Sequence, residues 1–224
     1  MNRRVTTIVV AAVIAGAALF VFLRGTSNDN EASDASSAGS FAAQTSWGEP
    51  NLTGVWKAEP LGARTGRDTF NLTELEALYT PDARARMQTL SAKDDPTMRC
   101  APPAFPRAAM LGHPVQIVQR PGFAFVLTEA YPVFRILPTT GRPHTSEQYL
   151  YPTHMGDSTA RWEGDTLVVD VIAFNGEGWL ASGDDKPTGA STGVWLTSPS
   201  LHVVERWRRV VAGTLEYRAT GGDP

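Results

Sequence analysis

The sequence predicts a mainly β protein: an antiparallel barrel, lipocalin-like or similar, or a sandwich, with one or two helices and an N-terminal transmembrane helix before it. Three observations support this prediction. Short runs rich in β-branched and aromatic residues recur after residue 114, separated by glycine or proline. Two of these runs meet at Glu163-Gly164-Asp165, where glycine can adopt the positive φ of a tight turn. An apolar run near the N-terminus precedes all of them.

The apolar run, Val5 to Leu23, would be about 28 Å long as a helix, which is enough to cross a bilayer. Arg3 and Arg4 precede it and favour a cytoplasmic N-terminus. We therefore predict that residues 1–24 are an uncleaved signal anchor that spans a bacterial inner membrane once and leaves the rest of the chain on the periplasmic side. The alternative is a signal peptide cut in the alanine-rich stretch at 37–43, which would release a secreted protein.

The segment after the anchor, residues 25–46, contains mainly Ser, Ala, Asn and Gly. This composition buries too little apolar surface to order itself, so we expect a flexible tether. The folded unit then runs from 47 to 224, which is the size of a single β-rich domain with one core.

The net charge limits the possible binding partners, and the cysteine content limits the possible disulfides. Three of the 20 lysines and arginines lie in the predicted anchor, so the exported part has 17 against 23 acidic residues, a net charge of −6. Such a surface repels phosphate backbones, and we expect no nucleic-acid partner. The single cysteine, Cys100, excludes an internal disulfide, and we expect it to be a buried core residue.

The secondary structure elements follow one another from residue 51 onward. A turn at Asn51 leads into a first short strand, and Thr80-Pro81-Asp82 is a helix start with a hydroxyl N-cap and proline at the first helical position. This helix should continue to about Leu90. Prolines between 95 and 107 predict an irregular connection. Further strands are predicted at 115–119, 123–129, 133–137, 158–162, 166–172, 201–211 and 214–220.

Strand periodicity places charged side chains on apolar faces. In the 123–129 run Glu129 shares a face with three apolar residues, and in the 201–211 run Glu205 lies among Leu, Val and Trp side chains. Arg135 likewise has aliphatic neighbours on its side. Because an unpaired buried charge is costly, we expect Arg135 to form a bidentate pair with Glu129 or Glu205.

This charged cluster has two interpretations. It could be a salt-bridge network that fixes strand register or plugs one end of a barrel. It could instead be the polar end of an apolar cavity, where a few converging polar groups orient a ligand. A carboxylate in such a cavity could also act as an acid or base.

Other candidate binding residues lie in or near loops. His144 and His154 could approach the rim of a pocket, although loop histidines more often bond to the backbone. Asp157, in the turn after His154, and Trp162, one of the aromatic residues that could line a cavity, complete the candidates. No histidine has the spacing of a zinc or iron site, so we predict neither metal nor cofactor. The sequence also lacks a G-x-S-x-G elbow, a P-loop and a dinucleotide fingerprint.

Several distinctive segments follow one another along the chain: Leu52-Thr53-Gly54-Val55-Trp56, Cys100-Ala101-Pro102-Pro103 with Pro106-Arg107, Gly141-Arg142-Pro143-His144, Trp162-Glu163-Gly164-Asp165-Thr166-Leu167-Val168-Val169 and His202-Val203-Val204-Glu205-Arg206. In these the chain resembles an uncharacterised family of exported bacterial β-rich proteins. The resemblance covers nearly everything after the tether and implies a compact domain of barrel type. It lends no reaction and no catalytic residue. The chain departs from the family where Leu196-Thr197-Ser198 replaces a frequent Pro-His-Ser and where Thr140 replaces a common Asp, which implies a lost or altered activity if those residues matter.

The leading functional hypothesis is a membrane-anchored, periplasmic-side β-barrel domain that binds a small, largely apolar molecule in a cavity containing Glu129, Arg135 and Glu205. One alternative is an enzyme, a lyase, isomerase or hydrolase that uses Glu205 or His144 for proton transfer. Another is an envelope module whose sheet edge or aromatic patch meets a protein partner. The oligomeric state is not determined by the sequence.

Overall fold

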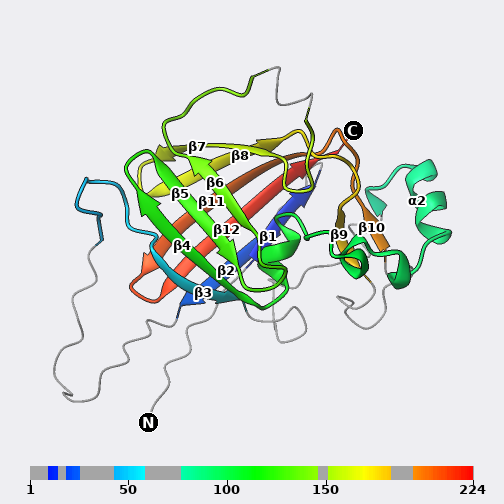
Figure 1. Cartoon of the computed structure of the whole chain (residues 1–224), viewed down its shortest axis with the longest axis horizontal. Helices are drawn as coiled ribbons and strands as arrows, with labels where there is room; N and C mark the ends of the chain where they lie inside the picture. The colour runs from blue at the N-terminus through cyan, green and yellow to red at the C-terminus, as the bar shows by residue number, and fades with distance from the viewer. Residues whose placement is uncertain are drawn as a thin grey trace, which may run out of the picture.

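The computed structural model describes residues 10–14, 19–25, 43–58, 77–145, 151–182 and 194–223, and they are mainly β, as predicted (Figure 1). The strands are β1 Val10–Ile14, β2 Leu19–Gly25, β3 Gly54–Ala58, β4 Pro114–Arg120, β5 Phe123–Thr128, β6 Phe134–Pro138, β7 Asp157–Glu163, β8 Thr166–Ile172, β9 Trp179–Ser182, β10 Val194–Leu196, β11 His202–Val211 and β12 Thr214–Gly222. The helices are α2 Pro81–Gln88 and α3 Arg107–Met110, with 3₁₀ turns at Ala92–Asp94 and Pro96–Arg99.

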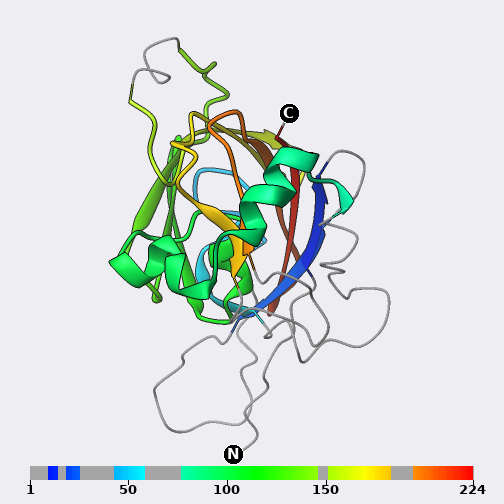
Figure 2. The same cartoon turned by 90° about the vertical axis from the view of Figure 1, so that its right-hand side faces the viewer.

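Most of the strands form one curved sheet in the order β6-β5-β4-β3-β2-β1-β12-β11-β8-β7 (Figures 1 and 2). Its neighbours are antiparallel, except that β1 runs parallel to β12. The predicted barrel is not closed in the described part of the chain, because no ladder joins the edge strands β6 and β7. One backbone hydrogen bond, from Gly141 N to Ala160 O at 2.8 Å, links the segment after β6 to β7.

The strand β1 and all but the last two residues of β2 fall within the apolar run that the sequence predicts as a transmembrane helix. None of the helices in the described ranges is both long enough and apolar enough to cross a membrane. Residues 1–9 and 15–18 of the predicted anchor, and 26–42 of the predicted tether, lie outside the described residues. The anchor, its cleavage and the periplasmic location therefore stay predictions.

The hairpin of β7 and β8 has the turn that the sequence indicates. Glu163 pairs with Thr166, and Gly164 between them has a φ of +63°. The predicted start of α2 is also confirmed, because the Thr80 hydroxyl accepts a hydrogen bond from Ala83 N and proline occupies the first turn. The strands β9 and β10 have no counterpart in the prediction. They pair with each other outside the large sheet, beside α2 (Figure 1).

The segment before β4 is more ordered than predicted. It contains the two 3₁₀ turns and α3. Cys100 caps the second turn with a φ of +62°, and its thiol is exposed. The expectation that Cys100 belongs to the core was wrong, because the residue ends a 3₁₀ turn outside the sheet and is exposed there.

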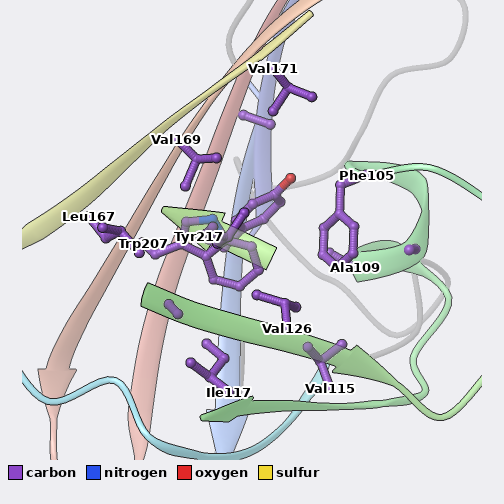
Figure 3. Packing of buried hydrophobic residues seen from close by; sticks show 14 of the residues in the cluster. Phe105, Ala109, Val115, Ile117, Val126, Leu167, Val169, Val171, Trp207 and Tyr217 are labelled. Carbon is purple, nitrogen blue, oxygen red and sulfur yellow. The ribbon is translucent and has the colours of Figure 1, made fainter. Parts of the chain in front are cut away.

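The core fills the inside of the curved sheet with aromatic rings (Figure 3). The rings of Trp207 on β11 and Tyr217 on β12 lie 4.3 Å apart, and Phe105, just before α3, lies 5.8 Å from Trp207. All three are at most 2% exposed. Small or aliphatic side chains of the facing strands, such as Val126, surround them. A second cluster joins α2 to β9 and β10 around the fully buried Met87 and Trp195.

Two glycines with similar backbone conformations provide a test of this packing. At Gly156, with a φ of +67°, an added Cβ would lie 2.7 Å from Ile172 O and 2.8 Å from a Val171 methyl group. At Gly164 an added Cβ would meet nothing within 4 Å. We expect Gly164→Ala to lower the free energy of unfolding by about 1–2 kcal/mol, and Gly156→Ala by about 1–3 kcal/mol more. Urea unfolding checks this difference, and equal losses would contradict the close approach at Gly156.

Candidate functional site

A buried ion pair lies inside the curved sheet. Arg135 on β6 donates through Nη1 to both carboxylate oxygens of Glu205 on β11, at 3.0 Å each. The two side chains are 3% and 0% exposed. The predicted pairing of Arg135 with Glu205 is confirmed, although one nitrogen serves both oxygens instead of the expected two-pronged fork.

Glu129 does not belong to this cluster. Its side chain is 64% exposed and lies 3.6 Å from His113 Nδ1. The face that Glu129 shares with Phe123 is the outer face of β5, whereas Ala124 and Val126 point inward. The expectation that Phe123 and Glu129 share the core face was wrong, because Phe105, Trp207 and Tyr217 already fill the interior and leave room there for small side chains only.

Further contacts hold the ion pair in place. Arg135 Nη2 donates to the Ser158 hydroxyl on β7 at 3.0 Å, and Trp207 Nε1 donates to Glu205 Oε2 at 3.1 Å. The Phe105 ring covers the Arg135 guanidinium at 4.6 Å from its centroid. The charges are thus enclosed by aromatic rings and bridge three strands.

Two polar groups in the interior lack a well-formed hydrogen bond. Arg135 Nε is buried without a partner within the described ranges, and the Tyr217 hydroxyl is buried beside the Glu205 carboxylate with a contact outside normal hydrogen-bond geometry. Burial, then the charge of Glu205 and hydrogen bonding to it, raise the pKa of Tyr217 well above its ordinary value, while the charge of Arg135 acts in the opposite direction. Tyr217 therefore stays a neutral donor close to both members of the ion pair.

Phe105 reaches the interior from residues 101–110, which we call the plug segment. The backbone hydrogen bonds seen for this segment are local: Ala101 N to Pro96 O, Ala108 N to Ala104 O and Ala109 N to Pro106 O. Its anchor is a buried pair in which Arg107 Nη2 lies 2.6 Å from Asp95 Oδ2. The plug segment is therefore held by side chains and not by a strand ladder.

Next to the plug segment lies a small apolar recess. Its walls include Phe105, Phe174, Trp179 and Leu201, with His154 as a polar neighbour. Its cavity volume of about 10 Å³ is about what one water molecule needs. Neither Arg135 nor Glu205 lines the recess, whereas Phe105 lines it and also contacts Arg135.

A second polar cluster lies on the outer face of the sheet. The ring of His144 lies between two carboxylates, with Nδ1 2.8 Å from Asp157 on β7 and Nε2 2.9 Å from Asp170 on β8. Asp170 also lies 3.1 Å from His202 Nε2 on β11, and the Thr159 hydroxyl is 3.4 Å from His144 Nε2. Both nitrogens of His144 are thus occupied.

The structure therefore divides the predicted site residues into separate groups. Arg135 and Glu205 meet inside the sheet, and His144 and Asp157 meet outside it, on opposite faces of β7. His154 lines the recess, and Trp162 is half-buried against the core. In the part of the chain that is described, no three His, Cys, Asp or Glu side chains are arranged to hold a metal ion.

Sequence reasoning missed several members of these groups. They are Phe105, Ser158, Tyr217 and, outside, Asp170. Alternation along β11 already placed Trp207 on the face of Glu205, and Tyr217 is its cross-strand neighbour in the β11–β12 register. That register was the one signal that could have identified Tyr217. Nothing in the sequence indicates that Phe105, outside any strand, enters the interior.

The buried pair makes a prediction about stability. Glu205→Gln leaves the Arg135 charge buried without a counter-charge, and we expect a loss of about 3–5 kcal/mol in the free energy of unfolding. The double variant Arg135→Met/Glu205→Leu should recover most of that loss, because no buried charge remains. Denaturant titration measures both. Glu163→Gln, which breaks the exposed pair with Arg206, is the control and should cost under about 1 kcal/mol. A double variant as unstable as the single one would contradict this account.

The buried Asp95–Arg107 pair that holds the plug segment leads to a prediction about the pH dependence of stability. Burial acts to raise the pKa of Asp95, but hydrogen bonds from Arg107 and Thr97 and the charge of Arg107 outweigh it and hold the pKa below its ordinary value. This contribution to stability is present above the pKa of the unfolded chain, about 3.9, and is lost as the pH falls through the lower folded pKa.

We therefore expect Asp95→Asn to be less stable than the parent protein at pH 7, and the difference to shrink as the pH falls below about 5. Thermal unfolding at a series of pH values measures it. Asp165→Asn, in the exposed turn between β7 and β8, serves as the control for removing one carboxylate. A stability gap between the parent and Asp95→Asn that stays constant down to about pH 2 would show that Asp95 does not behave in this way.

Comparison with protein-family models, with curated proteins and with solved structures finds no match for this chain. The resemblance drawn from the sequence segments therefore stays a prediction.

Proposed function

We propose that this domain binds a small, largely apolar molecule that carries one oxygen acceptor, in the interior position now taken by the Phe105 ring. The observation that carries the proposal is the pair of buried donors without a well-formed hydrogen bond, Arg135 Nε and the Tyr217 hydroxyl. A buried donor without a partner costs about 1–3 kcal/mol, and such groups in folded proteins call for an explanation. A ligand acceptor in this position would bond to Arg135 Nε or would offer the Tyr217 hydroxyl a better-aligned partner than Glu205.

The apolar part of such a ligand has a ready counterpart. The Phe105 ring lies on the Arg135 guanidinium and 6.3 Å from the Tyr217 ring, nearly edge-on. A flat aromatic or alicyclic ligand in place of Phe105 would keep these contacts. Phe105 is, in this view, an internal substitute for the ligand.

Entry requires the plug segment to move, because the recess holds no more than about one water molecule. The segment suits this role, since its backbone hydrogen bonds are local and the Asp95–Arg107 pair fixes it at one end. Segments without ladder hydrogen bonds open at lower free-energy cost than core strands. The recess beside Phe105 is the natural first contact for the ligand.

The geometry supports binding more than acid–base chemistry. Glu205 is fully buried and bonded to Arg135 and Trp207, and both nitrogens of His144 already face carboxylates. Neither group is left with a free position from which to exchange a proton with a substrate.

A pair of tyrosine variants tests the proposal. Phenols, aromatic carboxylic acids and terpenoid alcohols would be screened by thermal shift, since a ligand of the native state raises Tm with its occupancy. For a compound that stabilises the parent protein, Tyr217→Phe should weaken binding about fivefold by removing one hydrogen bond. Tyr151→Phe, at a residue that is 79% exposed, should leave the affinity unchanged. No stabilising compound, or the same affinity for both variants, would refute the proposal.

Phe105→Ala provides an independent arm. It should lower the free energy of unfolding by about 3–5 kcal/mol and yet bind the same compound more tightly, because the competing ring is gone. Calorimetric titration at a temperature where the variant remains folded measures the affinity. Weaker binding in this variant would show that the ligand does not occupy the Phe105 position.

A further inference from the structure

The outer surface of β3 to β6 carries apolar side chains where a sheet facing water usually carries polar ones. Phe134 is 64% exposed and Ile136 47%, and Phe123, Leu127 and Val55 are each exposed by more than a third. Phe125 is half-buried among them. We call these six residues the aromatic face. It lies on the strands drawn in front in Figure 1.

The aromatic face is one continuous patch and not a set of scattered residues. Strand register places Phe125 opposite Ile136, and Leu127 opposite Phe134. The rings of Phe123 and Phe125 stack at 6.4 Å along β5. Contiguous exposed apolar patches of this kind mark surfaces that meet a membrane or another molecule.

The charged side chains that point outward from the strands of the aromatic face are positive. The strands β3, β4, β5 and β6 contain no Asp or Glu, and their outward charged side chains are Lys57 and Arg120. Neither makes an ion pair within the described ranges. Glu129, which follows β5 at one end of the face, lies beside His113.

The opposite wall of the sheet differs in this respect. There the arginines are matched by acidic neighbours, in the pairs Arg161–Glu163, Arg206–Glu163, Arg208–Glu216 and Arg218–Glu216. The chain as a whole has a net charge of −3. The two unpaired bases next to exposed aromatic rings are therefore a local property of one face.

We infer that the aromatic face docks onto the surface of an anionic lipid bilayer. Phenylalanine and aliphatic side chains enter the boundary between headgroups and acyl chains, and nearby Lys and Arg are attracted by anionic headgroups. This surface is separate from the proposed ligand position, which lies on the inner side of the same strands.

A second copy of the chain fits the face less well. A symmetric dimer through this face would bring Lys57 and Arg120 of the two copies onto one shared surface with no acidic residue of these strands to match them.

The test places an environment-sensitive fluorophore on the face without removing any apolar residue. In the full chain carrying Cys100→Ser, Gln116→Cys, at an exposed position of β4 between Val55 and Leu127, receives a nitrobenzoxadiazole label. Arg161→Cys, on the outer face of β7 and 54% exposed, is labelled as the matched control. Vesicles of phosphatidylglycerol with phosphatidylcholine are added to each.

We expect the emission of the label at position 116 to rise and shift to the blue, and the label at 161 to stay unchanged. Because the comparison is between positions, an N-terminal anchor in the same vesicles would not produce it. Lys57→Gln with Arg120→Gln should weaken the partition that the label at 116 reports by about thirtyfold. Phe134→Ser should weaken it as well.

Four outcomes would overturn the inference. The first is no change at position 116. The second is an equal change at positions 116 and 161. The third is a change at 116 that appears without vesicles and grows with protein concentration, which would assign the face to a second copy of the chain. The fourth is a signal that is the same with pure phosphatidylcholine, because the face would then have no preference for anionic lipid.

Discussion

The ion pair between Arg135 and Glu205 connects parts of the sheet that no backbone ladder joins. Arg135 lies on β6, one edge of the sheet, and its guanidinium reaches Glu205 on β11 and Ser158 on β7, the other edge. Apart from these contacts, the segment after β6 is joined to β7 by the Gly141–Ala160 backbone hydrogen bond and by Arg142 and His144, which both contact Asp157. A buried pair of charges is seldom the most stable way to fill a core. Here the pair sets the distance between the two edges of the curved sheet, because its members lie on β6 and β11.

The rest of the interior is arranged around this pair. Trp207 donates a hydrogen bond to Glu205, and the Tyr217 ring packs on Trp207. Phe105, from a segment that is not a strand of the sheet, covers Arg135. The same contacts that stabilise the fold leave Arg135 Nε without a partner and the Tyr217 hydroxyl beside Glu205 without a well-formed hydrogen bond. The structural and the ligand-binding interpretations of the cluster are therefore compatible. A network that sets the curvature of the sheet can also hold donors in place for a guest, provided that the plug segment opens.

The two walls of the sheet have different surfaces. On β7, β8 and β11 carboxylates, histidines and arginines satisfy one another, and His144 ties the segment after β6 to this wall. On β3 to β6 the outward residues are apolar or basic apart from Gln116, and none is acidic. The first surface is already saturated with internal partners, whereas the second has none of its own. That contrast is why the outer His–Asp cluster is best explained as a fastening for a loop and the aromatic face as a surface for contact.

The sequence by itself determined the mainly β class, the hairpin at Gly164, the start of α2 and the inward position of Arg135 and Glu205, because each depends on local turn chemistry, capping or alternation. It did not determine which face of β5 is inside. Alternation puts Phe123 and Ala124 on opposite faces of β5 but does not indicate which face is buried. The rings of Phe105, Trp207 and Tyr217 decide this, because they fill the interior and leave room for the smaller side chain. The open edge between β6 and β7, the exposure of Cys100 and Glu129, and the meeting of His144 with Asp170 were likewise decided by the tertiary structure. All of them depend on contacts between segments far apart in the chain, which local patterns cannot encode.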